Sequence, residues 1–203
     1  MTPFRIFLLS PAHCGGKRAA LLLNERATFP LAERLRSSPG ATLGEAFSFL
    51  SGLYFRGKLT YASRFARPPA GEPGALIITT DRGLLPANTL IGTRDLVEFG
   101  SVDIQSDRPS YRRPLERDVT RIQQREDVEF VLLGSIATGK YVDVLTEILG
   151  TRLLFPSDFV GRGDMSRGAL LLRAVREGSE LTYDRVAGAV RRGLRARKVG
   201  VDP

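Results

Sequence analysis

The sequence predicts an α/β protein in which helices cover both faces of a four-stranded, mainly parallel sheet, giving three layers. Three observations lead to this prediction. Four short apolar runs are separated mostly by segments with helical periodicity. The run at residues 128–133 stops abruptly at Gly134-Ser135 and is followed by a helical pattern, as a buried parallel strand is. Strand–helix–strand order implies right-handed crossovers, and therefore parallel neighbours.

The N-terminal third is expected to hold the first strand and a long helix. Residues 6–9 form the strand, and Gly15-Gly16 marks a tight loop after it. Residues 17–35 have a helical pattern that Pro30 should break or kink.

A second long helix is expected to begin after residue 42. Thr42 suits the N-cap position, and Glu45 three residues later completes a capping box. The apolar positions Phe47, Leu50, Tyr54 and Tyr61 then form a stripe on one face.

Residues 75–79 give the second strand, followed by a turn at residues 81–83. Residues 84–107 are mixed, with either a short helix near Thr93 or a small hairpin over residues 97–104. The remaining expected elements are a helix at 114–125, the third strand at 128–133, a helix at 140–149 capped by Gly150, the fourth strand at 152–155, and helices at 166–176 and 183–197.

Composition points to a polyanionic partner. The 203 residues carry 30 Lys and Arg against 22 Asp and Glu, a formal net charge of +8. This favours nucleic acid or a phosphorylated ligand, although dispersed arginines on an ordinary basic protein would give the same total. We expect one domain over residues 1–203, with a basic C-terminal helix or tail from about residue 183.

Single copies of cysteine and histidine limit the chemistry. Cys14 has no partner for an intrachain disulfide, which favours a reducing compartment. One histidine disfavours a histidine-rich metal site, so we predict no metal and no cofactor. No leader pattern or membrane-length apolar run is present, and cytoplasmic residence is the expectation.

The loop after the first strand is one candidate for binding an anion. It joins His13, Cys14, Gly15, Gly16 and Lys17, so that backbone amides and a lysine would face a phosphate. A nucleophilic cysteine beside the imidazole is an alternative. A third alternative is a simple glycine turn in which the cysteine is a small buried apolar residue.

The segment after the third strand is the strongest indication of a ligand site. In open α/β sheets, ligands bind at the carboxyl ends of the strands, and the amides of the following helix favour an anion. Gly134, Ser135 and Lys140 are therefore expected to form a wall of the site.

Two carboxylates are candidates for general base or electrostatic stabiliser. Asp81 follows the second strand, although an ordinary Asp-x-Gly turn explains it equally well, and Asp158 follows the fourth. Near Asp158, Ser157 and Arg162 would contact substrate or anion. In the same loop, Asp164 is expected to cap the next helix.

The C-terminal segment suits a phosphate backbone. Arg191, Arg195 and Lys198 share one side of the expected last helix, at spacings of four and three. A solvated helix face near the chain end is the alternative.

Two short motifs resemble the uracil-DNA glycosylase-like superfamily. Residues 132–140, Leu-Leu-Gly-Ser-Ile-Ala-Thr-Gly-Lys, are similar to the family's Leu-Trp-Gly-Ser-x-Ala-x-x-Lys pattern, and Phe155-Pro156-Ser157 is similar to its His-Pro-Ser loop. The resemblance implies a parallel α/β fold and hydrolysis of a glycosidic bond in nucleic acid. Phe155 stands where the family has histidine, and no Gly-Gln-Asp-Pro motif follows the first strand.

A second resemblance, over the first half of the chain, is to small uncharacterised bacterial α/β proteins. It is carried by Cys14, Lys17, Leu53-Tyr54 through Tyr61-Ala62, and Gly83-Leu84-Leu85. This resemblance implies a fold but no activity.

Three functional hypotheses follow. The chain is an enzyme acting on a nucleotide or nucleic-acid base, a non-catalytic nucleic-acid-binding or regulatory module, or an enzyme acting on a small phosphate ester. The missing histidine and water-activating motif favour the second hypothesis over the first. Whether the protein is an enzyme, and its oligomeric state, are left open by the sequence.

Overall fold

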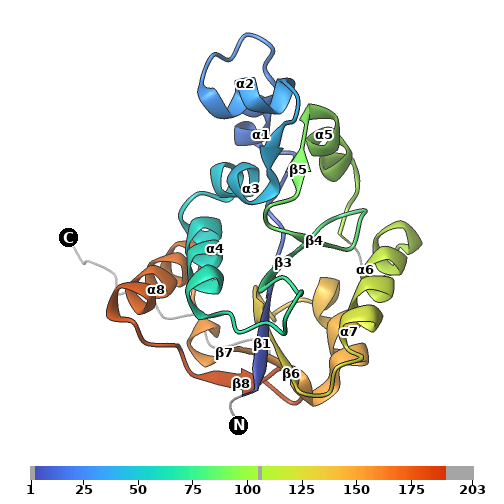
Figure 1. The fold of residues 1–203 in the computed structure, drawn as a ribbon, viewed down its shortest axis with the longest axis vertical. Helices are drawn as coiled ribbons and strands as arrows, with labels where there is room; N and C mark the ends of the chain where they lie inside the picture. The colour runs from blue at the N-terminus through green and yellow to red at the C-terminus, as the bar shows by residue number, and fades with distance from the viewer. Residues whose placement is uncertain (1–2, 105–106, 191–203) are drawn as a thin grey trace, which may run out of the picture.

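A six-stranded sheet forms the centre of the computed structural model, which describes residues 3–104 and 107–190 (Figure 1). The strand order is β4–β3–β1–β6–β7–β8. Four central strands are mutually parallel: β3 (Ala75–Ile78), β1 (Phe4–Leu9), β6 (Val128–Leu133) and β7 (Leu153–Pro156). The edge strands β4 (Leu84–Pro86) and β8 (Tyr183–Arg185) pair antiparallel to them. The α/β class is confirmed, whereas the expectation of a four-stranded sheet is wrong because both edges are extended.

Each added edge strand has a local cause. Gly83 has φ +73°, a conformation that glycine adopts readily, and it reverses the chain so that β4 folds back on β3. The Thr79 amide closes this turn on the Gly83 carbonyl at 2.8 Å. At the other edge, β8 pairs antiparallel with β7, and Phe155 lies opposite Asp184. A second, two-stranded sheet pairs β2 (Ala41–Thr42) with β5 (Leu90–Ile91).

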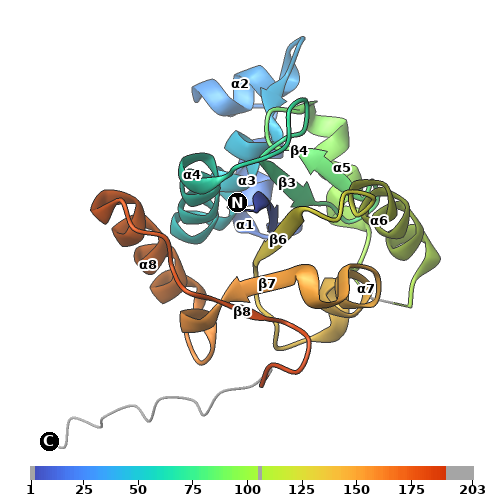
Figure 2. The same ribbon diagram turned by 60° about the horizontal axis from the view of Figure 1, so that its bottom comes forward.

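Helices cover both faces of the main sheet (Figure 2). Side chains of β1 alternate between two apolar clusters because successive residues of a strand point to opposite faces. Phe7 and Leu9 pack in the cluster with α3 (Leu43–Ser51), α4 (Leu53–Phe65) and α8 (Asp164–Glu177). Ile6 and Leu8 pack in the cluster with α6 (Pro109–Ile122) and α7 (Gly139–Leu149).

The carboxyl ends of the strands point toward a group of small helices. In Figure 1, α1 (Lys17–Leu23), α2 (Pro30–Arg36) and α5 (Thr93–Ser101) gather beyond that end of β1. Two short 3-10 turns flank β7, η1 (Gly150–Arg152) and η2 (Ser157–Phe159). Of the two alternatives for residues 84–107, the helix near Thr93 is confirmed, and it is α5.

The two long N-terminal helices are both divided. The helical pattern over residues 17–35 is broken, as predicted for Pro30, which begins a separate helix, α2, at a position where its missing amide costs no hydrogen bond. The predicted capping box of Thr42 and Glu45 is confirmed, with the Glu45 amide donating to the Thr42 hydroxyl at 3.3 Å. Gly52, with φ +59°, then separates α3 from α4.

Two expectations for the C-terminal third are wrong. Gly163, not Asp164, occupies the N-cap of α8, and Asp164 is the first helical residue, 3.5 Å from the Arg167 guanidinium. Residues 183–190 contain β8 and no helix, because the open edge of β7 offers backbone partners that outweigh helical periodicity. Residues 191–203, with Arg191, Arg195 and Lys198, lie outside the described residues.

Among the described residues, the search for a helix of sufficient length and apolarity to cross a membrane found none.

Candidate functional site

The strand order places a crevice at the carboxyl end of β1. Its neighbour β3 lies on one side and β6 on the other, so the loops that follow β1 and β6 lead to opposite faces of the sheet. Such a reversal of strand order is where ligands bind in open α/β proteins. In this chain it lies between the residues that follow Leu9 and Leu133.

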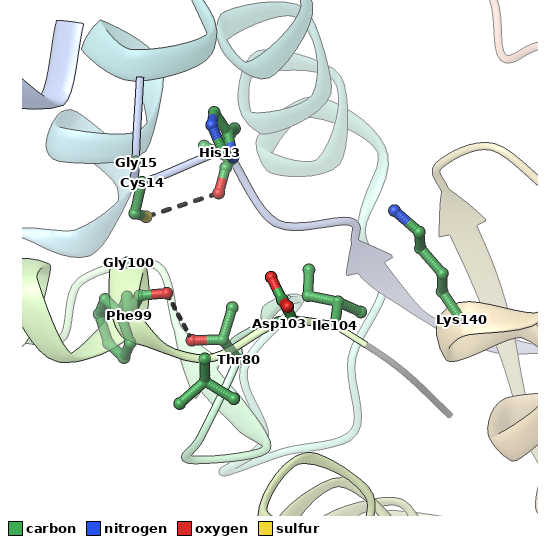
Figure 3. A pocket seen from close by; sticks show the side chains of 11 residues that line it. His13, Cys14, Gly15, Thr80, Phe99, Gly100, Asp103, Ile104 and Lys140 are labelled. Carbon is green, nitrogen blue, oxygen red and sulfur yellow. Dashed lines mark hydrogen bonds between the residues drawn. The ribbon is translucent and has the colours of Figure 1, made fainter. Parts of the chain in front are cut away.

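A cavity of about 470 Å³ opens at this edge (Figure 3). The volume is in the range that small-molecule ligands occupy. Three chain segments and the start of α7 form its walls, with these lining residues: Ala12, His13, Cys14, Gly15, Thr80, Phe99, Gly100, Val102, Asp103, Ile104 and Lys140.

The loop after β1 supplies one wall. His13 and Gly15 are exposed, whereas Ala12 and Cys14 are buried. The Cys14 thiol donates to the Ala12 carbonyl at 3.5 Å. Burial, with a smaller contribution from the nearby Asp81 carboxylate, raises the pKa of Cys14 to about 12. The thiol is therefore protonated at neutral pH, which disfavours the alternative of a nucleophilic cysteine. Gly16 and Lys17, also expected at the anion site, do not line the cavity.

The turn after β3 supplies a second wall through Thr80. The Thr80 hydroxyl donates to the Phe99 carbonyl at 2.9 Å. This hydrogen bond holds the start of the Phe99–Ile104 segment, which forms the third wall. Asp81 is next to Thr80 but does not line the cavity. Its Oδ1 is buried and has no hydrogen-bond partner among the described residues, and burial raises the pKa of the carboxyl. Its Oδ2 lies 3.8 Å from the Arg82 guanidinium.

Of the predicted site residues after β6, Gly134 and Ser135 hold the local structure, whereas Lys140 faces the cavity. The Ser135 hydroxyl accepts the Ala137 amide at 3.3 Å, and the Ser135 carbonyl accepts the Tyr141 hydroxyl at 3.0 Å. Gly134 packs against Ser10, since a Cβ there would lie 2.8 Å from the Ser10 Cβ. Of this predicted wall, Lys140 alone lines the cavity.

Lys140 is the exposed cation of the cavity. Its side chain extends from the start of α7 toward the end of β1, and the Asp103 carboxylate points into the same space (Figure 3). Among the described residues, no acid lies within ion-pair distance of Lys140, whereas Asp103 lies 3.9 Å from Arg108.

The loop after β7 is not part of the cavity. The Ser157 hydroxyl donates to the Thr182 carbonyl at 3.2 Å, which anchors the loop beside β8. Arg162 donates to the Asp158 carbonyl at 2.8 Å and to the Ser166 hydroxyl at 3.3 Å. The Asp158 side chain is exposed. The reason is topological: β6 separates β7 from β1, so this loop follows a strand one position farther from the crevice.

Sequence reasoning missed two features of this edge: the Phe99–Ile104 wall, which includes Asp103, and a buried contact between Lys58 and Ser10. Lys58 lies four residues after Tyr54 and three before Tyr61, on the buried face of α4. That spacing was the available signal, and the Lys58 side chain is 1% exposed.

Metal binding has no structural candidate in residues 3–104 and 107–190, where no three His, Cys, Asp or Glu side chains form a group that could hold an ion.

Comparisons with family models, with curated proteins and with solved structures gave no significant match. Function is therefore inferred from the residues and their geometry.

Proposed function

We propose that this protein binds a nucleotide, either free or within a nucleic-acid strand, in the cavity beyond β1 and β3. The observation that carries the proposal is Lys140, an exposed cation without an acidic partner among the described residues. It stands on one wall of an otherwise mostly uncharged cavity at the reversal of strand order. A lysine at the first turn of a helix adds its charge to the exposed amides there, and both favour a phosphate.

The rest of the lining suits a base and a sugar. Val102 and Ile104 offer apolar surface, and Gly15 and Gly100 leave backbone groups uncovered by side chains. Asp103 offers acceptors to ring N–H groups or ribose hydroxyls. The formal charge of +8 would draw an anionic ligand or strand toward the molecule.

Hydrolysis of a glycosidic bond, which the resemblance to the uracil-DNA glycosylase-like superfamily implies, is part of the proposal only through Asp81. That carboxylate adjoins the cavity and has an oxygen without a partner among the described residues. Asp158 does not reach the cavity lining, so the geometry favours binding more strongly than this chemistry.

Calorimetric titration with adenosine and uridine monophosphates tests the proposal. The Lys140→Ala variant should bind both nucleotides about tenfold more weakly, which corresponds to about 1.4 kcal/mol. Lys17→Ala is the matched control, because Lys17 is an exposed lysine at the start of α1 that does not line the cavity. Its affinity should stay within about twofold of that of the parent protein.

Ribose 5-phosphate serves as the baseless probe, and it should bind more weakly than either nucleotide because Val102 and Ile104 then lack an apolar partner. Absence of nucleotide binding, or equal losses in both lysine variants, would contradict a site in this cavity.

A further inference from the structure

Helix α6 carries a row of arginines spaced four residues apart. Arg113, Arg117 and Arg121 are all exposed, and this spacing places them along one side of the helix. At about 1.5 Å of rise per residue, the row is about 12 Å long. In both views, α6 lies at the outer margin of the molecule (Figures 1 and 2). We refer to these three residues as the α6 row.

The opposite side of α6 explains why the row faces outward. Tyr111, Leu115, Val119 and Ile122 are buried in the apolar cluster that α6 shares with the sheet. Because the sheet takes the apolar side, the other side is left with the arginines and with polar residues such as the exposed Thr120.

The acids of α6 lie on its flanks. Glu116 and Glu147 of α7 both accept hydrogen bonds from Arg112, so the charges on the side toward α7 neutralise each other. Asp118 is the acid that touches the row. Its Oδ1 accepts the Arg117 Nε at 2.9 Å, while its Oδ2 accepts the Leu84 amide at 2.9 Å.

Asp118 anchors Arg117 without covering it. The side chain of Asp118 is 12% exposed, whereas that of Arg117 is 69% exposed. An arginine has five N–H donors, and this contact uses the one on Nε. The outer end of the guanidinium therefore still faces solvent.

The other two arginines of the row carry unpaired charge. Among the described residues, no acid lies within ion-pair distance of Arg113 or Arg121, since the ion pairs of α6 itself are those of Arg112 and Arg117. Glu72 lines a shallow cavity together with Arg121 but is not paired with it.

The row starts near the nucleotide cavity and leads away from it. Arg108, the N-cap residue of α6, lies 3.9 Å from the carboxylate of Asp103, which lines the cavity. At the far end, Arg121 adjoins Val128, the first residue of β6. The cavity lies at the carboxyl ends of the strands, so the row extends from that edge of the sheet toward the opposite one.

We propose that the α6 row binds the phosphates of a single-stranded nucleic acid, one nucleotide of which occupies the cavity. The choice of a nucleic-acid strand rests on the proposed function. Arginine pairs with phosphate through two parallel hydrogen bonds, and an unpaired base can leave its strand to enter a cavity.

An anionic membrane is a poorer match for this surface. A helix that lies in a membrane interface inserts a free apolar side, and the apolar side of α6 is buried against the sheet. The large apolar residues that are exposed in the described chain include none from α6: Leu21, Leu90, Val97, Met165 and Val190.

Fluorescence anisotropy with a labelled oligouridylate long enough to extend from the cavity to Arg121 tests the proposal. Arg113→Gln with Arg121→Gln should weaken binding at least about tenfold at low salt. The slope of log affinity against log salt should become shallower by about 1.4, which is two phosphates at 0.7 each.

The matched control is Arg173→Gln with Arg176→Gln. It removes the same charge from two exposed arginines of α8, a helix on the other face of the sheet. Its affinity should stay within about twofold of that of the parent protein, and circular dichroism checks that both double variants fold.

Titration with uridine monophosphate separates the row from the cavity. The α6 variant should bind this nucleotide as the parent protein does, because the row lies outside the cavity lining. If the monophosphate fails to bind while oligonucleotide binding still depends on the row, the cavity proposal fails and the row stands.

Three results would overturn the row. They are a parent protein that does not bind the oligonucleotide at low salt, equal affinities in the α6 variant and the parent, and equal losses in the two double variants. Phosphatidylserine vesicles should not displace the oligonucleotide. Displacement would show that the surface serves a membrane, and would likewise overturn the proposal.

Discussion

Cys14 and Lys58 lie near the same edge of the sheet, and burial favours the neutral form of both side chains. Burial raises the pKa of the thiol to about 12 and lowers the pKa of the amine to about 7, because each shift favours the uncharged form. The consequences for reactivity are opposite. A neutral thiol is a poor nucleophile, whereas a neutral amine is a base.

Alkylation of Cys14 tests the first of these consequences. With iodoacetamide at mildly alkaline pH, the native protein should react at least about a hundredfold more slowly than the protein in guanidinium chloride, since little thiolate forms and the sulfur is covered. The denatured protein is the control for intrinsic reactivity. Equal rates in the two states would show that Cys14 is an accessible thiolate, and would restore the nucleophilic alternative.

At the scale of elements, α4 and α8 pack through glycines. A Cβ on Gly57 would lie 2.9 Å from the Gly168 carbonyl oxygen, and a Cβ on Gly168 would lie 2.9 Å from the Leu53 carbonyl oxygen. Backbone atoms cannot move aside as a flexible side chain can. The approach of the two helices therefore depends on both glycines, and it sets where α4 carries Lys58.

Gly168→Ala should lower the free energy of unfolding by about 1–3 kcal/mol, the usual cost of overpacking. Gly163→Ala is the control, because nothing lies within 4 Å of a Cβ there. Because Gly163 is the N-cap of α8, where alanine is less favourable than glycine, urea unfolding should show a loss of no more than about 1 kcal/mol for that control, without any overpacking. An unchanged midpoint for Gly168→Ala would mean that the two helices can separate without cost.

At the scale of the whole molecule, the positive charge is unevenly distributed along the chain. Residues 191–203 contain five Arg and Lys and one Asp, and so carry +4 of the formal +8. Arg191, Arg195 and Lys198 remain the predicted contacts to a nucleic-acid backbone, and they lie outside the described residues.

Binding to a single-stranded oligonucleotide at several salt concentrations tests this prediction. Arg191→Glu with Arg195→Glu should weaken binding and flatten its dependence on salt. The slope of log affinity against log salt should become shallower by roughly 0.7 for each phosphate that the protein no longer neutralises. Arg26→Glu with Arg64→Glu changes the net charge equally at two exposed sites elsewhere. If both double variants weaken binding to the same extent, the effect is one of net charge and not of these arginines.

Features set by neighbouring residues were predictable from the sequence, and features set by distant ones were not. The capping box at Thr42 follows from two residues three apart, and it is confirmed. Residues 183–190 form β8 and not the start of the expected helix, because their helical periodicity competes with the open edge of β7, whose position no local pattern reveals. The cavity wall at Asp103 likewise depends on Thr80, which holds Phe99 from another part of the chain.

The sequence alone determined the α/β class and the four parallel strands, because the periodicity and turn residues that indicate burial and chain reversal are local features of the sequence. Tertiary structure decided the edge strands, the shape of the cavity and the meeting of Lys58 with Ser10, 48 residues apart. The physical reason is that periodicity records how deeply a residue is buried but not which distant group it faces. For a polar side chain inside a protein, that partner decides its chemistry.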